Sequence, residues 1–430
     1  MRITVVGLGK IGLPLAIQFA RKGHLVMGSD INPRVSQLVN DGIEPFPGEE
    51  GLAEYLISAV RSGHLTATTK TKEAVSGSES VVVAVPLFVD EGGNPNFLAI
   101  DEATNEIGKG LRAGTLVSYE TTLPVGSTRD RLVPILERQS GLKVGRDFYV
   151  VFSPERVLTG RFFADLRRYP KIVGGVEPKS EKLGVEFYES VLDFDHRPDL
   201  SRPNGVWPLG SSEAAELAKL AETTYRDVNI ALANQFALHA EKIGVDIYKV
   251  IEACNSQVFS HIHQPGIAVG GHCIPVYPHL YLQGDPEATV VTASREANAM
   301  MPSRVVQRVK EELGSLDGKT IAILGLAYRG GVKEHAFSGA LALIKDLRTE
   351  GAIPKVHDPL YSDEEMSALG FEPYNLGEEC EAAILQTNHS EYSQLTAEDI
   401  PGAKFFVDGR NFSNPEIRKE IKTYVIGIGN

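Results

Sequence analysis

The first thirty residues contain the pattern that most restricts the fold. A short β-branched run at residues 3–6 leads into Gly7-Leu8-Gly9-Lys10-Ile11-Gly12, then a helical pattern at 11–21 and a second strand pattern at 25–28. In such a unit the first glycine permits a tight turn, the second lets the backbone approach a pyrophosphate, and the third allows the helix to pack closely on the strand. The positive end of the helix then faces the phosphates. The pattern predicts a βαβ unit that binds a dinucleotide.

An acidic residue in the expected place indicates which dinucleotide is bound. Asp30 directly follows the second strand pattern. A carboxylate there accepts hydrogen bonds from the ribose hydroxyls and repels a 2′-phosphate, which favours NAD over NADP. Arg34 is the nearby residue that opposes this preference. We predict NAD as the cofactor, bound by Gly7, Gly9, Lys10, Ile11, Gly12, Asp30 and Arg34.

Strand and helix patterns alternate at both ends of the chain, which predicts parallel α/β sheets. Apolar strand runs lie at residues 81–85 and 116–119, and the pattern restarts with strands at 319–326 and 354–357 around a helix at 338–349. Between them, residues 211–243 contain no glycine or proline, start with the capping candidates Ser211 and Ser212, and stop at Gly244. The predicted fold is α/β, with two Rossmann-like doubly wound domains joined by a long central helix. We place the boundaries at 1–200, 201–317 and 318–430.

Composition excludes several classes of protein. The net charge of −13 disfavours a nucleic-acid partner, although a local basic cluster can still bind a small anion. The longest apolar runs are too short to span a membrane, and no cleavable leader is apparent, so a cytoplasmic location is expected. The cysteines are Cys254, Cys273 and Cys380. Their spacing predicts neither a disulfide framework nor a metal site.

One cysteine lies in an unusual setting. The stretch Gly270-Gly271-His272-Cys273-Ile274-Pro275 places glycines beside a thiol, where they allow close backbone approach, and His272 could favour the thiolate. A lone cysteine is nevertheless more often a small buried apolar residue than a nucleophile. The motif by itself leaves both interpretations open.

Several segments in order carry a resemblance to a known family. They are GLGKIGLP at 7–14, ETTLPVGST at 120–128, SPERVLTGR at 153–161, KIVGG at 171–175, residues 213–235, PGIAVGGHCIP at 265–275, REANAMMP at 295–302 and GLAYR at 325–329. The chain resembles the UDP-glucose/GDP-mannose dehydrogenase family along its whole length, most closely the branch that acts on UDP-N-acetylhexosamines. The resemblance implies an NAD-binding N-terminal domain, a central helical region for catalysis and homodimerisation, and a C-terminal domain that binds the nucleotide sugar.

The resemblance also implies a reaction. The family oxidises C6 of the sugar of a nucleotide sugar to a carboxylate with two NAD. A cysteine thiolate captures the intermediate aldehyde as a thiohemiacetal, and a second oxidation gives a thioester that water hydrolyses.

Roles for individual residues follow from the same resemblance. Cys273 matches the nucleophile, Lys219 the lysine that stabilises the oxyanion, Glu155 the general acid/base, and Thr122 the threonine near the reacting carbon. Thr223 joins them in the catalytic set, and Pro86 and Thr122 join the cofactor site. The expected substrate-binding residues are Arg156, Val157, Leu158, Lys219, Gly270, Tyr277 and Arg329.

Three positions depart from the family pattern. Thr223 replaces an asparagine, Tyr277 an aspartate, and Ala336 an arginine. In the family, that asparagine and that aspartate help to organise the hydrolytic water. We therefore hypothesise that release of the acid is slow here or that the substrate is unusual. Alternatives that the sequence leaves open are arrest at the aldehyde, another sugar nucleotide, a β-hydroxyacid dehydrogenase and a non-catalytic binding protein.

Overall fold

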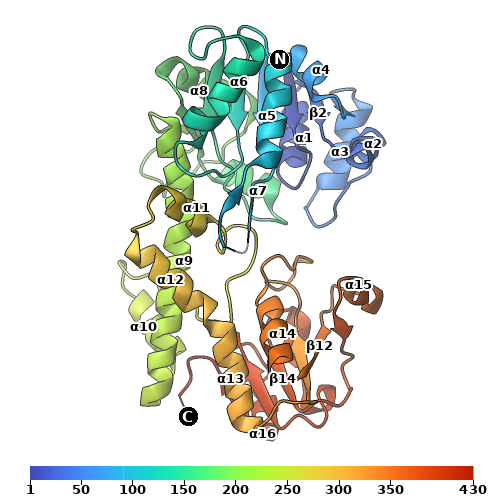
Figure 1. The fold of residues 1–430 in the computed structure, drawn as a ribbon, viewed down its shortest axis with the longest axis vertical. Coiled ribbons are helices and arrows are strands. Elements are labelled where there is room, and N and C mark those ends of the chain that lie inside the picture. Colours follow the sequence, from blue (N-terminus) through green and yellow to red (C-terminus); the bar gives the residue numbers. More distant parts are fainter. Residues whose placement is uncertain (91, 430) are drawn as a thin grey trace. The chain divides into compact units, whose positions relative to one another are not determined.

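The computed structural model describes residues 1–90 and 92–429 (Figure 1). The chain forms two compact units, one of residues 1–222 with 279–284 and one of residues 223–278 with 285–430. Each unit is described by itself below. Within the described residues, no helix combines the length and apolar character needed to cross a membrane.

The first unit contains an eight-stranded sheet in the order β10-β9-β8-β7-β4-β1-β2-β3. All neighbouring strands are parallel except β8 and β9, which are antiparallel. The chain winds outward from β1 in both directions, which is the doubly wound arrangement whose ligands bind beyond the carboxyl ends of the strands. The strands are β1 Arg2–Val6, β2 Leu25–Ser29, β3 Leu65–Thr68, β4 Ser80–Val83, β7 Leu116–Tyr119, β8 Tyr149–Phe152, β9 Lys171–Gly175 and β10 Val206–Pro208.

Helices cover both faces of this sheet because its central strands are apolar on both sides. In β1, Ile3 and Val5 belong to one buried cluster, whereas Val6 belongs to the cluster on the opposite face. Helices α1, α3 and α7 pack against one another, and α4, α5 and α6 form a second group. The helices are α1 Gly12–Arg21, α2 Pro33–Asn40, α3 Leu52–Arg61, α4 Thr71–Ser76, α5 Leu98–Gly110, α6 Val133–Ser140, α7 Phe162–Arg168 and α8 Pro178–Val191, with the π-helix η1 Thr128–Leu132 and the hairpin strands β5 Phe88–Val89 and β6 Pro95–Asn96.

The central helix is confirmed as one continuous element. α9 runs over Ser212–Ile243, 32 residues or about 48 Å at 1.5 Å per residue. Ser211 caps it, because its Oγ accepts the Ala214 N–H at 3.1 Å, and Gly244 ends it with a positive φ of 73°. Further helices follow at α10 Ile247–Asn255, α11 Tyr277–Gly284, α12 Thr289–Ala299 and α13 Met301–Leu313.

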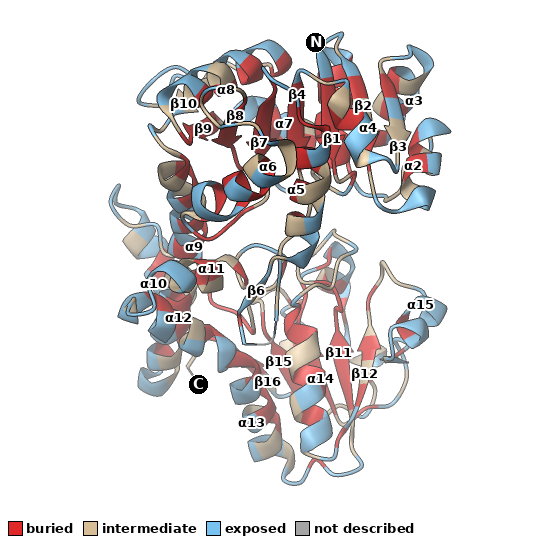
Figure 2. Ribbon diagram, turned by 45° about the horizontal axis from the view of Figure 1, so that its top comes forward, coloured by how far each residue is buried: buried red, intermediate tan, exposed pale blue. Residues whose placement is uncertain are grey.

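The second unit contains a six-stranded, fully parallel sheet in the order β13-β12-β11-β14-β15-β16. This is the Rossmann order 3-2-1-4-5-6, and Figure 2 shows its strands buried beneath helices with exposed outer faces. The elements are β11 Thr320–Leu324, α14 Gly339–Thr349, β12 Ile353–His357, α15 Asp363–Ala368, β13 Glu372–Pro373, β14 Ala382–Leu385, β15 Phe405–Asp408, α16 Ile417–Glu420 and β16 Thr423–Val425, with short 3₁₀ turns η2 Ser390–Gln394 and η3 Ala397–Asp399.

The α/β fold class is therefore confirmed, and the expected elements differ from the observed ones mainly at their ends. The strand expected at 81–85 ends at Val83, and the strand expected at 319–326 ends at Leu324, because the apolar residues that follow each strand belong to loops. β10 pairs with β9, so the first sheet extends beyond the boundary expected at residue 200.

Candidate active site

The three motif glycines have different surroundings. Gly7 has a positive φ of 88°, and a Cβ there would lie 2.9 Å from the Ala84 carbonyl oxygen. A Cβ on Gly12 would overlap the Gly7 carbonyl oxygen, whereas nothing lies within 4 Å of one on Gly9. Gly7 and Gly12 therefore serve the turn and the helix–strand packing, and Gly9 borders the open space that a pyrophosphate needs.

The end of α1 and Asp30 complete a site that fits NAD. α1 has no side-chain cap at Ile11 and no acidic residue in its first turn, so neither its cap nor its first turn places a carboxylate at its positive end. Asp30 accepts the Leu8 N–H at 2.8 Å and the Asn32 N–H at 2.9 Å. A carboxylate has about four acceptor positions, so Asp30 retains capacity for ribose hydroxyls.

The other expected cofactor residues follow neighbouring strands. Pro86 comes after β4 and Thr122 after β7, and these strands are paired. The Thr121 hydroxyl donates to the Val85 carbonyl at 2.6 Å, which joins the two loops. Thr122 is buried, and Arg34 is exposed in the first turn of α2.

Glu155 lies in a buried ionic cluster that the sequence did not predict. Lys171 Nζ donates to Glu120 Oε2 at 2.6 Å and also to Glu155 Oε1, and all three residues are buried. The Tyr188 hydroxyl is hydrogen-bonded to the other oxygen of Glu120. Burial raises the pKa of Glu120 to about 8, with the charge of Lys171 opposing the shift and that of Glu155 adding to it.

The first unit brings two of the predicted catalytic residues together. Lys219, on α9, donates from Nζ to the backbone carbonyl of Glu155 at 2.7 Å. Arg156 forms an ion pair with Glu222 at 3.0 Å and donates to the Pro170 carbonyl at 3.3 Å. The loop that begins at Glu155 is thus attached to α9 at two points.

Two further carboxylates hold this loop and its neighbour in place. Asp165, which is fully buried, accepts the Leu158 N–H at 3.1 Å. Glu216, also fully buried and on α9, accepts from Gly126 N–H at 2.6 Å, Thr128 N–H at 2.9 Å and the Thr128 hydroxyl at 2.7 Å. Glu216 therefore anchors the turn that follows Thr122.

Cys273 differs from the other two cysteines in its exposure. Cys273 is exposed, Cys254 is partly buried on α10, and Cys380 is buried. Burial raises the pKa of Cys380, which disfavours its thiolate. Cys273 is therefore the accessible thiol of the three.

The glycines before Cys273 permit close contact with the loop after β11. A Cβ on Gly270 would lie 2.5 Å from Cβ of Tyr328, and Gly271 has a φ of 93°. The Gly271 N–H donates to the Ala336 carbonyl at 2.9 Å. His272 lies 3.4 Å from Glu334, so its nearest charged partner is a carboxylate.

A buried network behind the Cys273 loop was not predicted either. Arg295 Nε lies 3.0 Å from Asp227 Oδ2, and Arg295 NH1 donates to the Pro275 carbonyl at 2.9 Å. Asn298 donates to Asp227 Oδ1 at 2.8 Å, and Asn234 Oδ1 accepts the Gly266 N–H at 2.9 Å. These contacts attach both ends of the Cys273 loop to α9 and α12.

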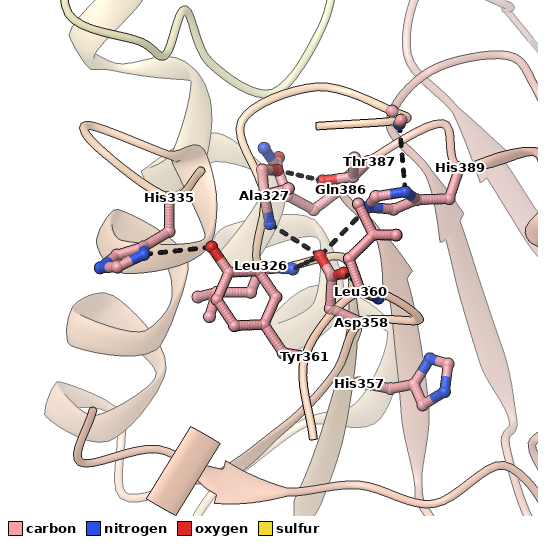
Figure 3. A network of polar contacts seen from close by, with 12 residues as sticks. Leu326, Ala327, His335, His357, Asp358, Leu360, Tyr361, Gln386, Thr387 and His389 are labelled. Carbon is pink, nitrogen blue, oxygen red and sulfur yellow. Dashed lines mark hydrogen bonds and ion pairs between the residues drawn. The ribbon is translucent and has the colours of Figure 1, made fainter. Parts of the chain in front are cut away.

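In the second unit, Asp358 follows β12, as Asp30 follows β2 in the first unit (Figure 3). Asp358 accepts the N–H groups of Leu326 at 2.9 Å and Ala327 at 2.8 Å, and His389 Nε2 lies 3.1 Å away. Although burial raises the pKa of Asp358, its hydrogen bonds with His389 and Ala327 hold it below its usual value. Among the described residues, Asp358 thus has more hydrogen-bond partners than Asp30 has.

The remaining predicted residues lie at defined positions. Thr223 is buried on α9, Tyr277 is the first residue of α11, and Arg329 lies in the loop after β11. Val157 precedes Leu158 in the loop after β8. Ala336 accepts the hydrogen bond from Gly271 through its backbone.

Sequence reasoning missed the residues that hold the site. Glu120, Lys171, Asp227 and Arg295 all lie inside segments that carried the family resemblance, but none received a role. The available signal was a charged residue within an otherwise apolar strand or helix pattern, as at Lys171, which begins the fully buried β9.

Comparison with known proteins agrees with this geometry. Three family models match, the NAD binding domain at residues 1–192, the central domain at 213–300 and the UDP binding domain at 322–415 of the UDP-glucose/GDP-mannose dehydrogenase family. A UDP-N-acetyl-D-mannosamine dehydrogenase of Pyrococcus horikoshii is 35% identical over 419 residues, 96% of each chain.

Solved structures agree as well. The structure of the Pyrococcus horikoshii UDP-D-ManNAc dehydrogenase covers 100% of both chains with a TM-score of 0.88 at 32% identity. A UDP-glucose dehydrogenase from Pyrobaculum islandicum covers 100% of this chain and 98% of its own with a TM-score of 0.86 at 26% identity. The chain therefore belongs to the UDP-glucose/GDP-mannose dehydrogenase family and is an NAD-dependent nucleotide-sugar dehydrogenase.

Proposed function

We propose that this enzyme oxidises C6 of a UDP-N-acetylhexosamine, with UDP-N-acetyl-D-mannosamine as the first candidate. The observation that supports this substrate is the 35% identity to the Pyrococcus horikoshii enzyme over 96% of both chains. The UDP-glucose dehydrogenase structure has a nearly equal TM-score at lower identity, so the fold alone does not distinguish the two sugars.

In the proposed mechanism, the first unit binds the cofactor and handles protons. Gly9 and the positive end of α1 receive the pyrophosphate, and Asp30 receives the adenosine ribose. NAD bound by these residues would supply the hydride acceptor for the two oxidations. Glu155 exchanges a proton with the substrate or the attacking water, and Lys219 donates hydrogen bonds to the oxygen on which negative charge develops.

Cys273 provides the covalent step. Its thiolate attacks the aldehyde carbon, and the carbonyl oxygen takes a proton, which gives a thiohemiacetal. Loss of hydride and a proton then gives a thioester. Water adds to the thioester, and the carbon–sulfur bond breaks to release the acid and return the thiol. Tyr277 follows this loop directly and, with Arg329, contributes to substrate binding in this proposal.

Thr223 and Tyr277 support a second outcome. They stand where the family has an asparagine and an aspartate that help to organise water, and proximity of that water supplies much of the rate of hydrolysis. The alternative proposal is therefore slow thioester breakdown, with the aldehyde or a bound thioester accumulating. Otherwise these residues determine the choice of sugar.

One experiment tests both. The enzyme is incubated with NAD and separately with UDP-N-acetylmannosamine, UDP-N-acetylglucosamine, UDP-N-acetylgalactosamine and UDP-glucose, and products are identified by mass spectrometry. We expect the uronate from an N-acetylhexosamine. Absence of NADH with all four sugars would contradict the proposal, and an aldehyde or a protein adduct that persists would favour the alternative.

We also propose a homodimer formed through α9. Tyr225, Leu232, Phe236 and Ile243 are 55%, 45%, 38% and 57% exposed. Their spacing of seven, four and seven residues places them along one face of the helix. Exposed apolar stripes of this kind mark interaction surfaces. Light scattering of a Leu232→Glu, Phe236→Glu variant should report a monomer, and an unchanged mass relative to the wild type would contradict this interface.

Two assignments from the sequence remain part of the proposal. The functional division into residues 1–200, 201–317 and 318–430 is retained, with catalysis and dimerisation in the central region. A reducing, cytoplasmic compartment is proposed because all three cysteines are free thiols and the mechanism needs Cys273 reduced.

A further inference from the structure

The cluster of Glu120, Lys171 and Tyr188 has no role in the mechanism above, although it is connected directly to Glu155. With Glu155, its residues come from four different parts of the first unit. Glu120 follows β7, Glu155 lies in the loop after β8, Lys171 begins β9, and Tyr188 lies on α8. Their exposed fractions are 3%, 8%, 4% and 0%. Charged groups at such buried positions are costly unless they are paired.

The charges in the cluster do not balance if every acid is ionised. Two carboxylates face one ammonium, which would leave one negative charge buried and uncompensated. Lys219 donates to the backbone of Glu155, and the ion pair of Arg156 with Glu222 lies on the exposed side of the same loop. Neither of these two contacts involves the Glu120 carboxylate.

A single proton on Glu120 removes this imbalance. Burial raises the pKa of Glu120 to about 8, which favours its protonated form. The two carboxylates differ in their surroundings, because Glu120 is the more deeply buried and contacts the Tyr188 hydroxyl. The negative charge of Glu155 then balances the positive charge of Lys171.

The hydroxyls around Glu120 accommodate either protonation state. Tyr188 Oη lies 2.6 Å from Ser118 Oγ, and either atom can be the donor. When Glu120 is ionised, Tyr188 donates to it. When Glu120 is protonated, it donates to Tyr188, which then donates to Ser118. No polar atom of Glu120 or Tyr188 loses its partner in either state.

We propose that Lys171 is a positioning residue that orients Glu155 and holds it as a carboxylate, and that Glu120 is the proton-bearing counterpart that keeps the buried cluster neutral. This inference rests on the proposed function, since it gives the reason why Glu155 serves as a base. Neither Lys171 nor Glu120 touches the substrate. Their effect on the reaction passes through the ionisation and orientation of Glu155.

The first test is the pH profile of the Lys171→Met variant. Lys171→Met removes the ammonium that compensates the buried carboxylates of the cluster, so the acidic limb of kcat/KM should move to higher pH. At pH 7 we expect kcat to fall by at least about 100-fold, the scale of a general acid–base contribution. The KM for NAD should change little. Lys171→Arg, which keeps the charge and the donors, should return the acidic limb toward its wild-type position.

A matched control shows whether removal of a different lysine has the same effect on the pH profile. Lys179 is exposed near the N-terminus of α8, and its Nζ lies 4.6 Å from the centre of the Tyr149 ring. Lys179→Met should leave the pH profile unchanged. A purely structural role for Lys171 would lower activity by the same factor at every pH without moving the limb, and that result would overturn the proposal.

The second test needs no enzymatic activity. The infrared difference spectrum of wild type minus Glu120→Gln should show a protonated-carboxyl band at pH 6 that disappears by pH 10, because the difference removes the contribution of Glu216, whose pKa burial also raises. A difference spectrum without this band would overturn the assignment of the proton to Glu120. If the wild type oxidises no UDP-sugar, the proposed function fails, and this spectrum still reports independently on the cluster.

Discussion

The ion pair between Arg295 and Asp227 provides the sharpest test of how the Cys273 loop is held. Asp227 is fully buried, and the Arg295 side chain is 13% exposed. Replacing Arg295 with methionine leaves the Asp227 carboxylate without its cation and removes the hydrogen bond to the Pro275 carbonyl. Asn298 still donates to Asp227 in the variant.

The expected cost is large because one charge remains buried. Removing one partner of a buried ion pair costs about 3–5 kcal/mol, and the hydrogen bond to Pro275 adds about 1 kcal/mol. For a unit of this size each kcal/mol lowers Tm by about 2–4 °C. Calorimetry should therefore show the transition of the second unit about 10–20 °C lower in Arg295→Met.

Two control variants test whether the loss of stability comes from the buried charge. Lys419 pairs with Glu416 on the surface, with side chains 69% and 63% exposed, and Lys419→Met should cost less than about 1 kcal/mol. Adding Asp227→Asn to Arg295→Met removes the stranded charge and should recover most of the loss. The reasoning is wrong if Arg295→Met is no more destabilising than Lys419→Met, or if the double variant recovers nothing.

Three further predictions concern the cofactor, the nucleophile and pH. Because Asp30 repels a 2′-phosphate, kcat/KM should favour NAD over NADP, and a clear preference for NADP would contradict the assignment. Cys273→Ser should nearly abolish acid formation while NAD binding persists, whereas Cys380→Ala should keep the chemistry; unchanged acid yield in Cys273→Ser would exclude the covalent role. Burial raises the pKa of Glu216 from 4.5 to about 7, so the stability from this group is complete below pH 4.5 and lost as pH rises to about 7. Urea unfolding of Glu216→Gln should lack this part of the pH dependence, and parallel curves for the two proteins would contradict it.

Local patterns were sufficient to predict the elements because the signals are local. The glycines of the first loop, the uninterrupted run of α9 and the apolar strand runs each depend on neighbours in sequence. They predicted β1, α1, β7 and α9 with ends correct to within a residue or two. Strand ends were less accurate at β4 and β11, because an apolar residue in the loop after a strand is indistinguishable by sequence from one in the strand.

The candidate site was predictable only in part. Glu155, Lys219 and Cys273 were identified through a resemblance, whereas their supporting residues come from strands and helices far apart in the chain. Lys171 meets Glu120 across 51 positions, and Arg295 meets Asp227 across 68. No periodicity links such residues, since their encounter depends on the order of strands in the sheet and on the packing of α12 against α9.

The sequence by itself determined the α/β class, the dinucleotide loop and the long helix, because these depend on residue type and short spacing. The tertiary structure decided which charges are buried together. Folding removes Lys171, Glu120 and Glu155 from water. Only in this buried setting does the charge state of each group strongly affect the others. It likewise exposed Cys273 while burying Cys380. Burial is a property of the assembled fold, and for that reason the protonation and reactivity of these groups could not be read from the chain alone.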